Sequence, residues 1–344
     1  MAAGASARNE YRQARTDPGA GDGEGLVGGA RFTAGPGCQQ RSEVCTDQQV
    51  KVCRRTGTGQ FEKRTVDFAM TGLSTSGNVG EAALLVNTEH RLRILTFNRP
   101  DRLNALTPEL HKGLHEALAD AAADVNVGAV LLKGAGRAFC SGGDVKRSAE
   151  QSAGQTPETV EQRADNVIAH GASTVLLSHM PKPTIALING VAAGSGLSLA
   201  LACDLRFASA DAVFRTAYAG VALSGDLGIS HSLTRIVGSA RACELMLLNE
   251  KIGAEEAFRI GLVHRIYDPS DFPAQPLQIA ASLAQGPGVA LRYIKQNLHF
   301  AESGSLEQVI EREAYNTARC VRTQDVKEAA LAFREKRAPV FTGR

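Results

Sequence analysis

Two glycine-rich turns carry residue types that could do chemistry in this sequence. The first, residues 139–146, reads FCSGGDVK, and the second, residues 189–196, reads NGVAAGSG. The second turn lies between an apolar run of strand length and an aliphatic run, residues 197–202, that predicts a helix. Glycine leaves backbone N–H groups accessible, and a helix N-terminus attracts negative charge. Two such turns together could hold one oxyanion, while two ordinary tight connections remain the alternative.

Other kinds of active site fit these turns less well. The glycines of the second turn lack the G-x-G-x-x-G spacing of a dinucleotide site, and the sequence contains no G-x-x-x-x-G-K-[ST]. Ser198 lies in GLSLA, which approaches the G-x-S-x-G of hydrolases, but it follows the turn and is expected on a helix face. Cys140 has no histidine near it in the sequence and is interpreted as a small packing residue.

A pair of histidines, His111 and His115, has the i, i+4 spacing of metal ligands on a helix. The pair lacks the Glu of the zinc motif H-E-x-x-H. We therefore expect a solvated helix face at these positions, and the sequence predicts no metal site.

The composition excludes several classes of function. The 344 residues are 43% hydrophobic with a net charge of +2, and no basic block is interleaved with aromatic residues, so nucleic-acid binding is not expected. The seven cysteines form no C-x-x-C pair, which argues against a zinc site or disulfide framework and favours a reducing compartment. No apolar run reaches the roughly 18 residues of a membrane span. We expect no membrane partner and a cytoplasmic location, with the mitochondrial matrix as the alternative.

The chain divides into three predicted regions. Residues 1–80 are rich in Gly, Ser, Thr, Gln and Arg without a helical or strand period, which predicts a disordered or weakly ordered extension. The functional chain could also begin at Met70. Residues 81–270 alternate between strand and helix patterns and form the predicted core. Residues 271–344 are predicted to be a C-terminal helical region.

Individual elements follow from periodicity and capping residues. Strands are predicted at residues 92–97, 127–132, 184–188, 205–208 and 213–216. Helices are predicted to begin at two Thr-Pro-Glu sequences, residues 107–109 and 156–158, where Thr caps and Pro takes the first helical position. From Ser239 onward the pattern is helical throughout, with further caps at Ser305 and Thr323. These elements predict an α/β core followed by helices.

Taken together, four spaced motifs resemble those of the crotonase (enoyl-CoA hydratase/isomerase) family. They are FNRP with NAL (97–100 and 104–106), AFCSGGD (138–144), NGVAAGSG (189–196) and AFREKRAPVF (332–341). The resemblance covers residues 83–344 and implies a core that is a spiral of ββα units. It also implies a C-terminal helical region that assembles homotrimers, often paired into hexamers. The implied substrate is an acyl thioester of coenzyme A, with no separate cofactor.

The resemblance also implies positions for the substrate. The thioester oxygen would be held by the backbone amides of Gly143 and Ser195, which stabilise it as an enolate oxyanion. The coenzyme A moiety would pass Arg102 and Leu103, and its adenine would lie near Ser141 and Lys146. A neighbouring subunit would offer Phe333 and Lys336 near the phosphates.

Departures from the family pattern indicate the reaction. Enoyl-CoA hydratases of the family hold a water molecule between two glutamates, and those positions here are Ser198 and Tyr218. Neither is a carboxylate base at neutral pH, although either could orient the substrate. Asp226, eight residues after Tyr218, resembles the catalytic aspartate of dienoyl-CoA isomerases and ring-epoxide isomerases. One carboxylate is enough to move a double bond, because it removes a proton from one carbon and returns it to another.

The sequence therefore predicts an acyl-CoA isomerase with Asp226 as the base, and it leaves alternatives open. The protein could be an enoyl-CoA hydratase with a rearranged water site, or a coenzyme A-binding member of the family that has lost catalysis. Asp226 could instead cap a helix, and Tyr218 could be a core residue with a satisfied hydroxyl. Three apolar neighbours are expected to shield Asp226 from water, namely Leu223, Leu227 and Ile229.

Overall fold

A computed structural model describes residues 49–55, 61–67, 82–144 and 158–344 of the chain. Its contacts divide the chain into two units, residues 1–76 and 77–344, each described here by itself. In the first unit, β1 (Gln49–Arg55) pairs antiparallel with β2 (Phe61–Asp67). The sequence analysis did not predict these strands, because an alternation of only a few residues is a weak signal beside so many turn-forming residues.

The second unit contains a six-stranded sheet with the order β12-β9-β7-β5-β4-β3. Its strands are β3 (Leu84–Glu89), β4 (Leu92–Phe97), β5 (Ala129–Gly134), β7 (Thr184–Ile188), β9 (Leu205–Ser209) and β12 (Arg265–Tyr267). All neighbours are parallel except β3 and β4. Both faces are covered, as parallel sheets require.

A second, four-stranded sheet has the order β11-β10-β8-β6. Its strands are short: β6 (Ala138–Cys140), β8 (Val191–Ala193), β10 (Val213–Arg215) and β11 (Ile252–Gly253). The strand pairs β5/β6, β7/β8 and β9/β10 each place their first strand in the large sheet and their second in the small one. A helix follows each pair, so the repeated unit is ββα and the predicted spiral core is confirmed.

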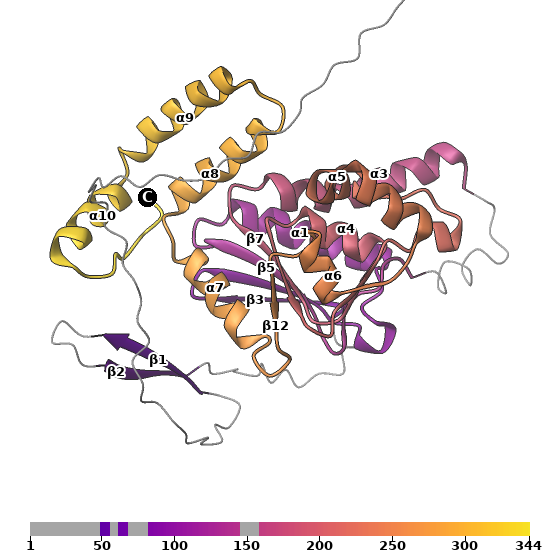
Figure 1. Ribbon diagram of the computed structural model, residues 1–344, viewed down its shortest axis with the longest axis horizontal. Coiled ribbons are helices and arrows are strands. Elements are labelled where there is room, and N and C mark those ends of the chain that lie inside the picture. Colours follow the sequence, from indigo (N-terminus) through magenta and orange to yellow (C-terminus); the bar gives the residue numbers. More distant parts are fainter. Residues whose placement is uncertain (1–48, 56–60, 68–81, 145–157) are drawn as a thin grey trace, which may run out of the picture. The chain divides into compact units, whose positions relative to one another are not determined.

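Helices cover both faces of the large sheet (Figure 1). Those of the core are α1 (Pro108–Ala123), α3 (Val160–His179), α4 (Ser195–Ala202), α5 (Ile229–Leu248) and α6 (Ala254–Arg259). The alternation along β5 explains the two layers: Val130 and Leu132 pack into the core with α1, α4 and α5, whereas Ala129 and Leu131 pack against α7 (Ala274–Ala284).

Three further helices complete the chain: α8 (Gly288–Ala301), α9 (Leu306–Cys320) and α10 (Gln324–Glu335). The predicted caps at Ser305 and Thr323 are confirmed, since each hydroxyl accepts a backbone N–H three residues later. Among the residues that the structure describes, none of the helices combines the length and apolar character needed to cross a membrane.

Two expectations about helices are wrong. The chain after Ser239 is not wholly helical, because β11 and β12 lie in it; such two- and three-residue strands are too short to show a period. The helix expected to begin at 156–158 is capped instead by Thr159, whose side chain and that of Gln162 form a capping box. Residues 156 and 157 lie outside the described part of the chain.

Candidate active site

The two glycine-rich turns lie against each other. Gly142 has φ 96°, and a Cβ built on it would lie 2.9 Å from the carbonyl oxygen of Ala193 and 3.5 Å from the amide nitrogen of Ser195. A Cβ on Gly196 would lie 2.4 Å from the carbonyl oxygen of Cys140. Side chains at these two positions would therefore separate the turns. The nearest group that approaches Gly142 and Gly196 is the backbone of the other turn.

This contact leaves two backbone donors unused. Leu106 forms an isolated parallel bridge with Gly143, in which its N–H donates to the Gly142 carbonyl (2.8 Å) and its carbonyl accepts from Asp144 (3.1 Å). The N–H of Gly143 takes no part in this bridge, and Ser195 is the first residue of α4, where an N–H has no acceptor within the helix. Within the described residues neither amide has an acceptor, and a Cβ on Gly143 would meet no atom within 4 Å.

The positions of these donors fit an oxyanion site. A Cβ on Gly143 would point into space that no described residue fills, and the Ser195 amide adds the positive end of the α4 dipole. The first turn is fixed by an ion pair between Arg99 and Asp144 (3.0 Å), with side chains that are 20% and 14% exposed. Two fixed N–H groups of this kind can stabilise negative charge that develops on a carbonyl oxygen.

Asp226 lies at the same place. Its Oδ1 accepts hydrogen bonds from the hydroxyl of Tyr218 (2.6 Å) and the hydroxyl of Ser195 (3.0 Å), and its Oδ2 lies 3.2 Å from the Ser195 hydroxyl. The side chain does not cap α5, whose N-cap is Gly228. The alternative of a capping aspartate is therefore excluded. Of the expected apolar shield, Leu227 and Ile229 are buried but Leu223 is 57% exposed, so that part of the expectation is wrong.

Tyr218 and Ser198 extend this network into the core. Their hydroxyls lie 3.0 Å apart, and Ser198 also donates to the Gly194 carbonyl (3.3 Å). Burial, and then the charge of Asp226, raise the pKa of Tyr218 well above its usual value, so the phenol stays protonated and donates to Asp226. Ser198 is fully buried on α4, which excludes the exposed nucleophile of a hydrolase elbow.

The residues predicted to bind coenzyme A are brought together only in part. Arg102 is exposed at the end of the short helix η1 (Pro100–Arg102), and the carbonyl of Leu103 accepts from the amide of Ser141 (3.0 Å). These three residues therefore adjoin the first turn. Lys146 lies outside the described residues.

The other two predicted coenzyme A contacts lie at the end of α10. Phe333 is 88% exposed and Lys336 is the exposed C-cap of that helix. The structure describes one chain, so their service to a neighbouring subunit stays a prediction.

Two smaller expectations have opposite outcomes. Burial raises the pKa of the Cys140 thiol to about 12, so it is an inert packing residue as predicted. His111, expected on a solvated face, is only 8% exposed, and its ring stacks on that of His170 with centroids 4.0 Å apart. The i, i+3, i+7 spacing of His111 with the buried Leu114 and Leu118 could have revealed this burial. No cluster of metal ligands occurs in the described part of the chain.

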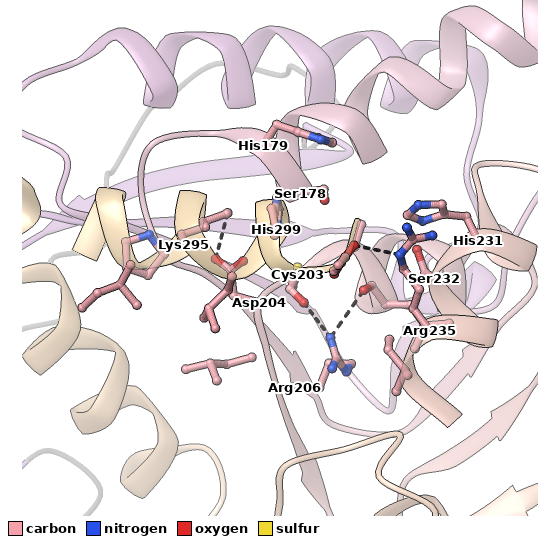
Figure 2. Close-up of a pocket in the computed structure, with 18 of the residues that line it drawn as sticks. Ser178, His179, Cys203, Asp204, Arg206, His231, Ser232, Arg235, Lys295 and His299 are labelled. Carbon is pink, nitrogen blue, oxygen red and sulfur yellow. Dashed lines mark hydrogen bonds and ion pairs between the residues drawn. The ribbon is translucent and has the colours of Figure 1, made fainter. Parts of the chain in front are cut away.

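A separate pocket of about 580 Å³ lies between the core and α8 (Figure 2). It holds charged groups that sequence reasoning missed, of which Lys295 pairs with Asp204 at 2.8 Å. Arg206 donates to the carbonyl of Cys203 at 2.6 Å, and Arg235 pairs with Glu302 at 2.7 Å. Asp226 does not line this pocket. The charged groups of this pocket already form ion pairs and hydrogen bonds with other segments of the protein. We therefore look for the chemistry at the two glycine-rich turns.

Comparisons with known proteins show which family the chain resembles. The sequence model of the family described as Enoyl-CoA hydratase/isomerase matches residues 87–344. The chain is 34% identical over 264 residues to the 1,2-epoxyphenylacetyl-CoA isomerase of Escherichia coli (strain K12), covering 76% of this chain and 98% of the relative. It is 31% identical to the short-chain-enoyl-CoA hydratase of Clostridium acetobutylicum, covering 74% and 95%.

The same likeness extends to three dimensions. The structure of a putative enoyl-CoA hydratase/isomerase from Mycobacterium abscessus superimposes with a TM-score of 0.72 at 33% identity, covering 76% of this chain and all of that one. The chain therefore belongs to the enoyl-CoA hydratase/isomerase (crotonase) family of enzymes, which bind acyl-CoA thioesters.

Proposed function

We propose that this protein is an acyl-CoA isomerase that moves a double bond, or rearranges a ring epoxide, in an enoyl-CoA thioester. The observation that supports this most is the hydrogen bond between the Asp226 carboxylate and the Ser195 hydroxyl. The amide of the same Ser195 is one of the two unused donors of the oxyanion turns. One residue thus ties the base to the group that would hold the thioester oxygen.

The proposed reaction uses these groups in sequence. Asp226 removes a proton from the carbon next to the thioester, and the electron pair moves onto the thioester oxygen as an enolate. The amides of Gly143 and Ser195 stabilise that oxygen, each by roughly 3 kcal/mol in typical oxyanion sites. Asp226 then returns the proton to a different carbon. The shortest hydrogen bond to the carboxylate, 2.6 Å, runs from the Tyr218 hydroxyl to Oδ1. Oδ2 is therefore the proposed proton acceptor.

Isomerisation is preferred to hydration because a single carboxylate lies in the network. The positions that resemble the two glutamates of hydratases are Ser198 and Tyr218, and the structure directs both hydroxyls into buried hydrogen bonds. Adding water needs a base to activate it and an acid to protonate the neighbouring carbon. A shuttle needs one group for both transfers. The relative named as an isomerase supports the same preference.

The test is to incubate the protein with 2-enoyl-, 3-enoyl- and dienoyl-CoA thioesters in heavy water, and to analyse the products by mass spectrometry. Isomeric products that carry deuterium, and that disappear in Asp226→Asn, are expected. Water addition that survives in Asp226→Asn would overturn the proposal. Binding of the thioesters without any turnover would identify a family member that has lost catalysis.

An enoyl-CoA hydratase is the second candidate, favoured by the relatives that carry that name. In that case the Tyr218 and Ser195 hydroxyls would orient water beside Asp226. The hydrated product gains the mass of one water molecule, whereas an isomer does not, so the same experiment separates the two reactions.

We also propose a homotrimer or a dimer of trimers, with no cofactor besides the coenzyme A of the substrate. Apolar side chains are exposed along α8, α9 and α10, including Ile294, Leu298, Leu306, Ile310 and Phe333. Exposed apolar side chains that gather on neighbouring helices are typical of protein interfaces. Light scattering of the purified chain would give the oligomer mass directly, and a monomer at micromolar concentration would contradict the proposal.

The proposed contacts with the coenzyme A moiety are Arg102, Leu103, Ser141, Lys146, Phe333 and Lys336.

A further inference from the structure

Two stacked histidines form a feature that the proposed reaction does not use. His111 on α1 and His170 on α3 have ring centroids 4.0 Å apart and planes inclined by 8°. His111 is 8% exposed, and its Nδ1 is buried without a hydrogen-bond partner in the described residues. A buried polar atom without a partner typically costs about 1–3 kcal/mol, so its presence needs an explanation.

This stack adjoins the base of the proposed reaction. His170 lies one helical turn before Thr174 on α3, and a Cβ on Gly228 would lie 3.9 Å from Cγ2 of Thr174. Gly228 is two residues after Asp226. The charge of Asp226 also acts on His170, where it opposes the lowering of the pKa. This face of α3 therefore borders the loop that carries Asp226.

The same face holds further unused hydrogen-bonding groups. The hydroxyls of Ser173 and Thr174 are buried without partners among the described residues, and these side chains are 1% and 8% exposed. Apolar residues would make the expected wall for a plain alkyl chain. Several unpartnered polar atoms buried beside the loop of Asp226 instead match a ligand that carries a polar group.

Electrostatics define the charge of that group. Burial, and then the His170 ring, lower the pKa of His111 to about 4, while burial and Arg163 lower that of His170. Both rings are therefore neutral at pH 7, and each offers one donor and one acceptor. The charges that act on His170 are of opposite sign, since Arg163 lowers its pKa and Asp226 raises it, so neither an anionic nor a cationic acyl group is favoured. The matching group is a neutral oxygen.

We propose that His170, held flat against His111, recognises the acyl end of the substrate, and that this acyl group carries a neutral hydroxyl or keto oxygen. The inference rests on the proposed function, because the acyl end reaches His170 only if the thioester lies at Gly143, Ser195 and Asp226. An acyl group without the oxygen gives His170 no hydrogen-bond partner, so such a substrate is expected to have a lower kcat/KM.

The test compares 3-hexenoyl-CoA with its 5-hydroxy and 6-hydroxy analogues and with 7-oxo-3-octenoyl-CoA, whose ketone is not conjugated with the double bond. The readout is kcat/KM for deuterium uptake from heavy water at the carbon next to the thioester, which is common to all four. The wild type is expected to prefer at least one oxygenated analogue by roughly tenfold or more, as loss of a recognised hydrogen bond typically gives. His170→Phe, which keeps a flat ring, is expected to lose that preference while plain 3-hexenoyl-CoA exchanges within about threefold of wild type.

Two further variants separate recognition from a structural effect. His170→Gln keeps a donor and an acceptor and is expected to retain part of the preference. His179→Phe changes another histidine of α3, one that is exposed and faces His299, and is expected to retain all of it. An unchanged preference in His170→Phe, or a wild type that favours the plain thioester, overturns the inference while exchange at Asp226 still stands. Absence of exchange with all four thioesters refutes the proposed function itself.

Discussion

Asp204 and Asp226 are two partly buried carboxylates with different partners. Asp204 Oδ2 accepts from the Lys295 ammonium (2.8 Å) and from the amide (2.8 Å) and hydroxyl (3.0 Å) of Thr184. The carboxylate of Asp226 accepts from the hydroxyls of Tyr218 and Ser195 alone among the residues that the structure describes. One carboxylate is paired with a cation, and the other has neutral donors only.

This difference fits a structural role for Asp204 and the proposed chemical role for Asp226. A neighbouring cation opposes protonation of a carboxylate, so a carboxylate that must take up and return a proton is better served by neutral donors. Lys295 lies on α8 and Asp204 precedes β9, so their pair joins a C-terminal helix to the core (Figure 2). Neutral hydroxyls hold Asp226 in place and leave it able to act as a base.

The largest expected effect comes from the same substitution at both sites. Asp226→Asn removes the proposed base and is expected to lower kcat by about 10²- to 10⁴-fold, as loss of a general base typically does. Asp204→Asn leaves Lys295 without its counter-charge, so it is expected to lower the unfolding temperature and retain activity below it. Activity assays and thermal unfolding measure the two effects. A folded Asp204→Asn protein without turnover would contradict the structural role given to Asp204.

Substitution of Lys295, the ion-pair partner of Asp204, tests the structural role of this pair. Lys295→Met removes the ion-pair partner of the partly buried Asp204 and is expected to lower the free energy of unfolding by up to about 3 kcal/mol. The double variant Lys295→Met with Asp204→Asn is expected to recover part of that loss, because no unpaired charge remains. Chemical denaturation of the three variants measures it. A double variant less stable than Lys295→Met would contradict the charge argument.

Acid should weaken the region around Asp226 through the stacked histidines. The pKa of His111 is lowered from 6.5 to about 4 in the folded protein, so only the unfolded chain takes up this proton between those values. The free energy of unfolding therefore falls as pH decreases from 6.5 to 4, by about 3 kcal/mol in total.

The measurement compares unfolding of the wild type and His111→Phe at pH 7 and pH 4. The difference in unfolding free energy between the two proteins is expected to shift in favour of the variant at the lower pH. His231→Phe, at an exposed position, is the control and should leave the pH dependence as in the wild type. A parallel response in wild type and His111→Phe would show that His111 does not carry the acid sensitivity.

The sequence predicted the parts of the fold that have long patterns. The strands β4, β7 and β9 each span five or six residues, and the helix α1 spans sixteen with its apolar residues on one face. The strands β6 and β8 were not predicted, since each has three residues and they pair with each other across about fifty positions of sequence. Such strands exist because the fold brings their segments together, which local propensity does not encode.

The same distinction holds at the site. Gly143 and Ser195 could be proposed from the sequence because they stand at fixed places within motifs that resemble a family pattern, and Asp226 because its position resembles that of a family aspartate. The contact of His111 with His170 could not, because it depends on how α1 packs against α3. Nor did the sequence indicate that the Ser195 hydroxyl would bind Asp226, thirty-one residues away.

The smallest expected effect concerns how Asp226 is held. Tyr218→Phe removes the donor of the 2.6 Å hydrogen bond to Oδ1 and leaves the Ser195 hydroxyl as the remaining side-chain donor among the described residues. A hydrogen bond to a charged group is worth about 1.5–3 kcal/mol, and part of it is recovered by the Ser195 hydroxyl, so kcat is expected to fall by roughly tenfold. KM should change little, because Tyr218 holds the base and is not among the proposed coenzyme A contacts. Steady-state kinetics with the preferred thioester measure both constants. A loss as large as that of Asp226→Asn would mean that the phenol itself transfers a proton, and the contrast with Asp204 would then lie in the tyrosine as much as in the carboxylate.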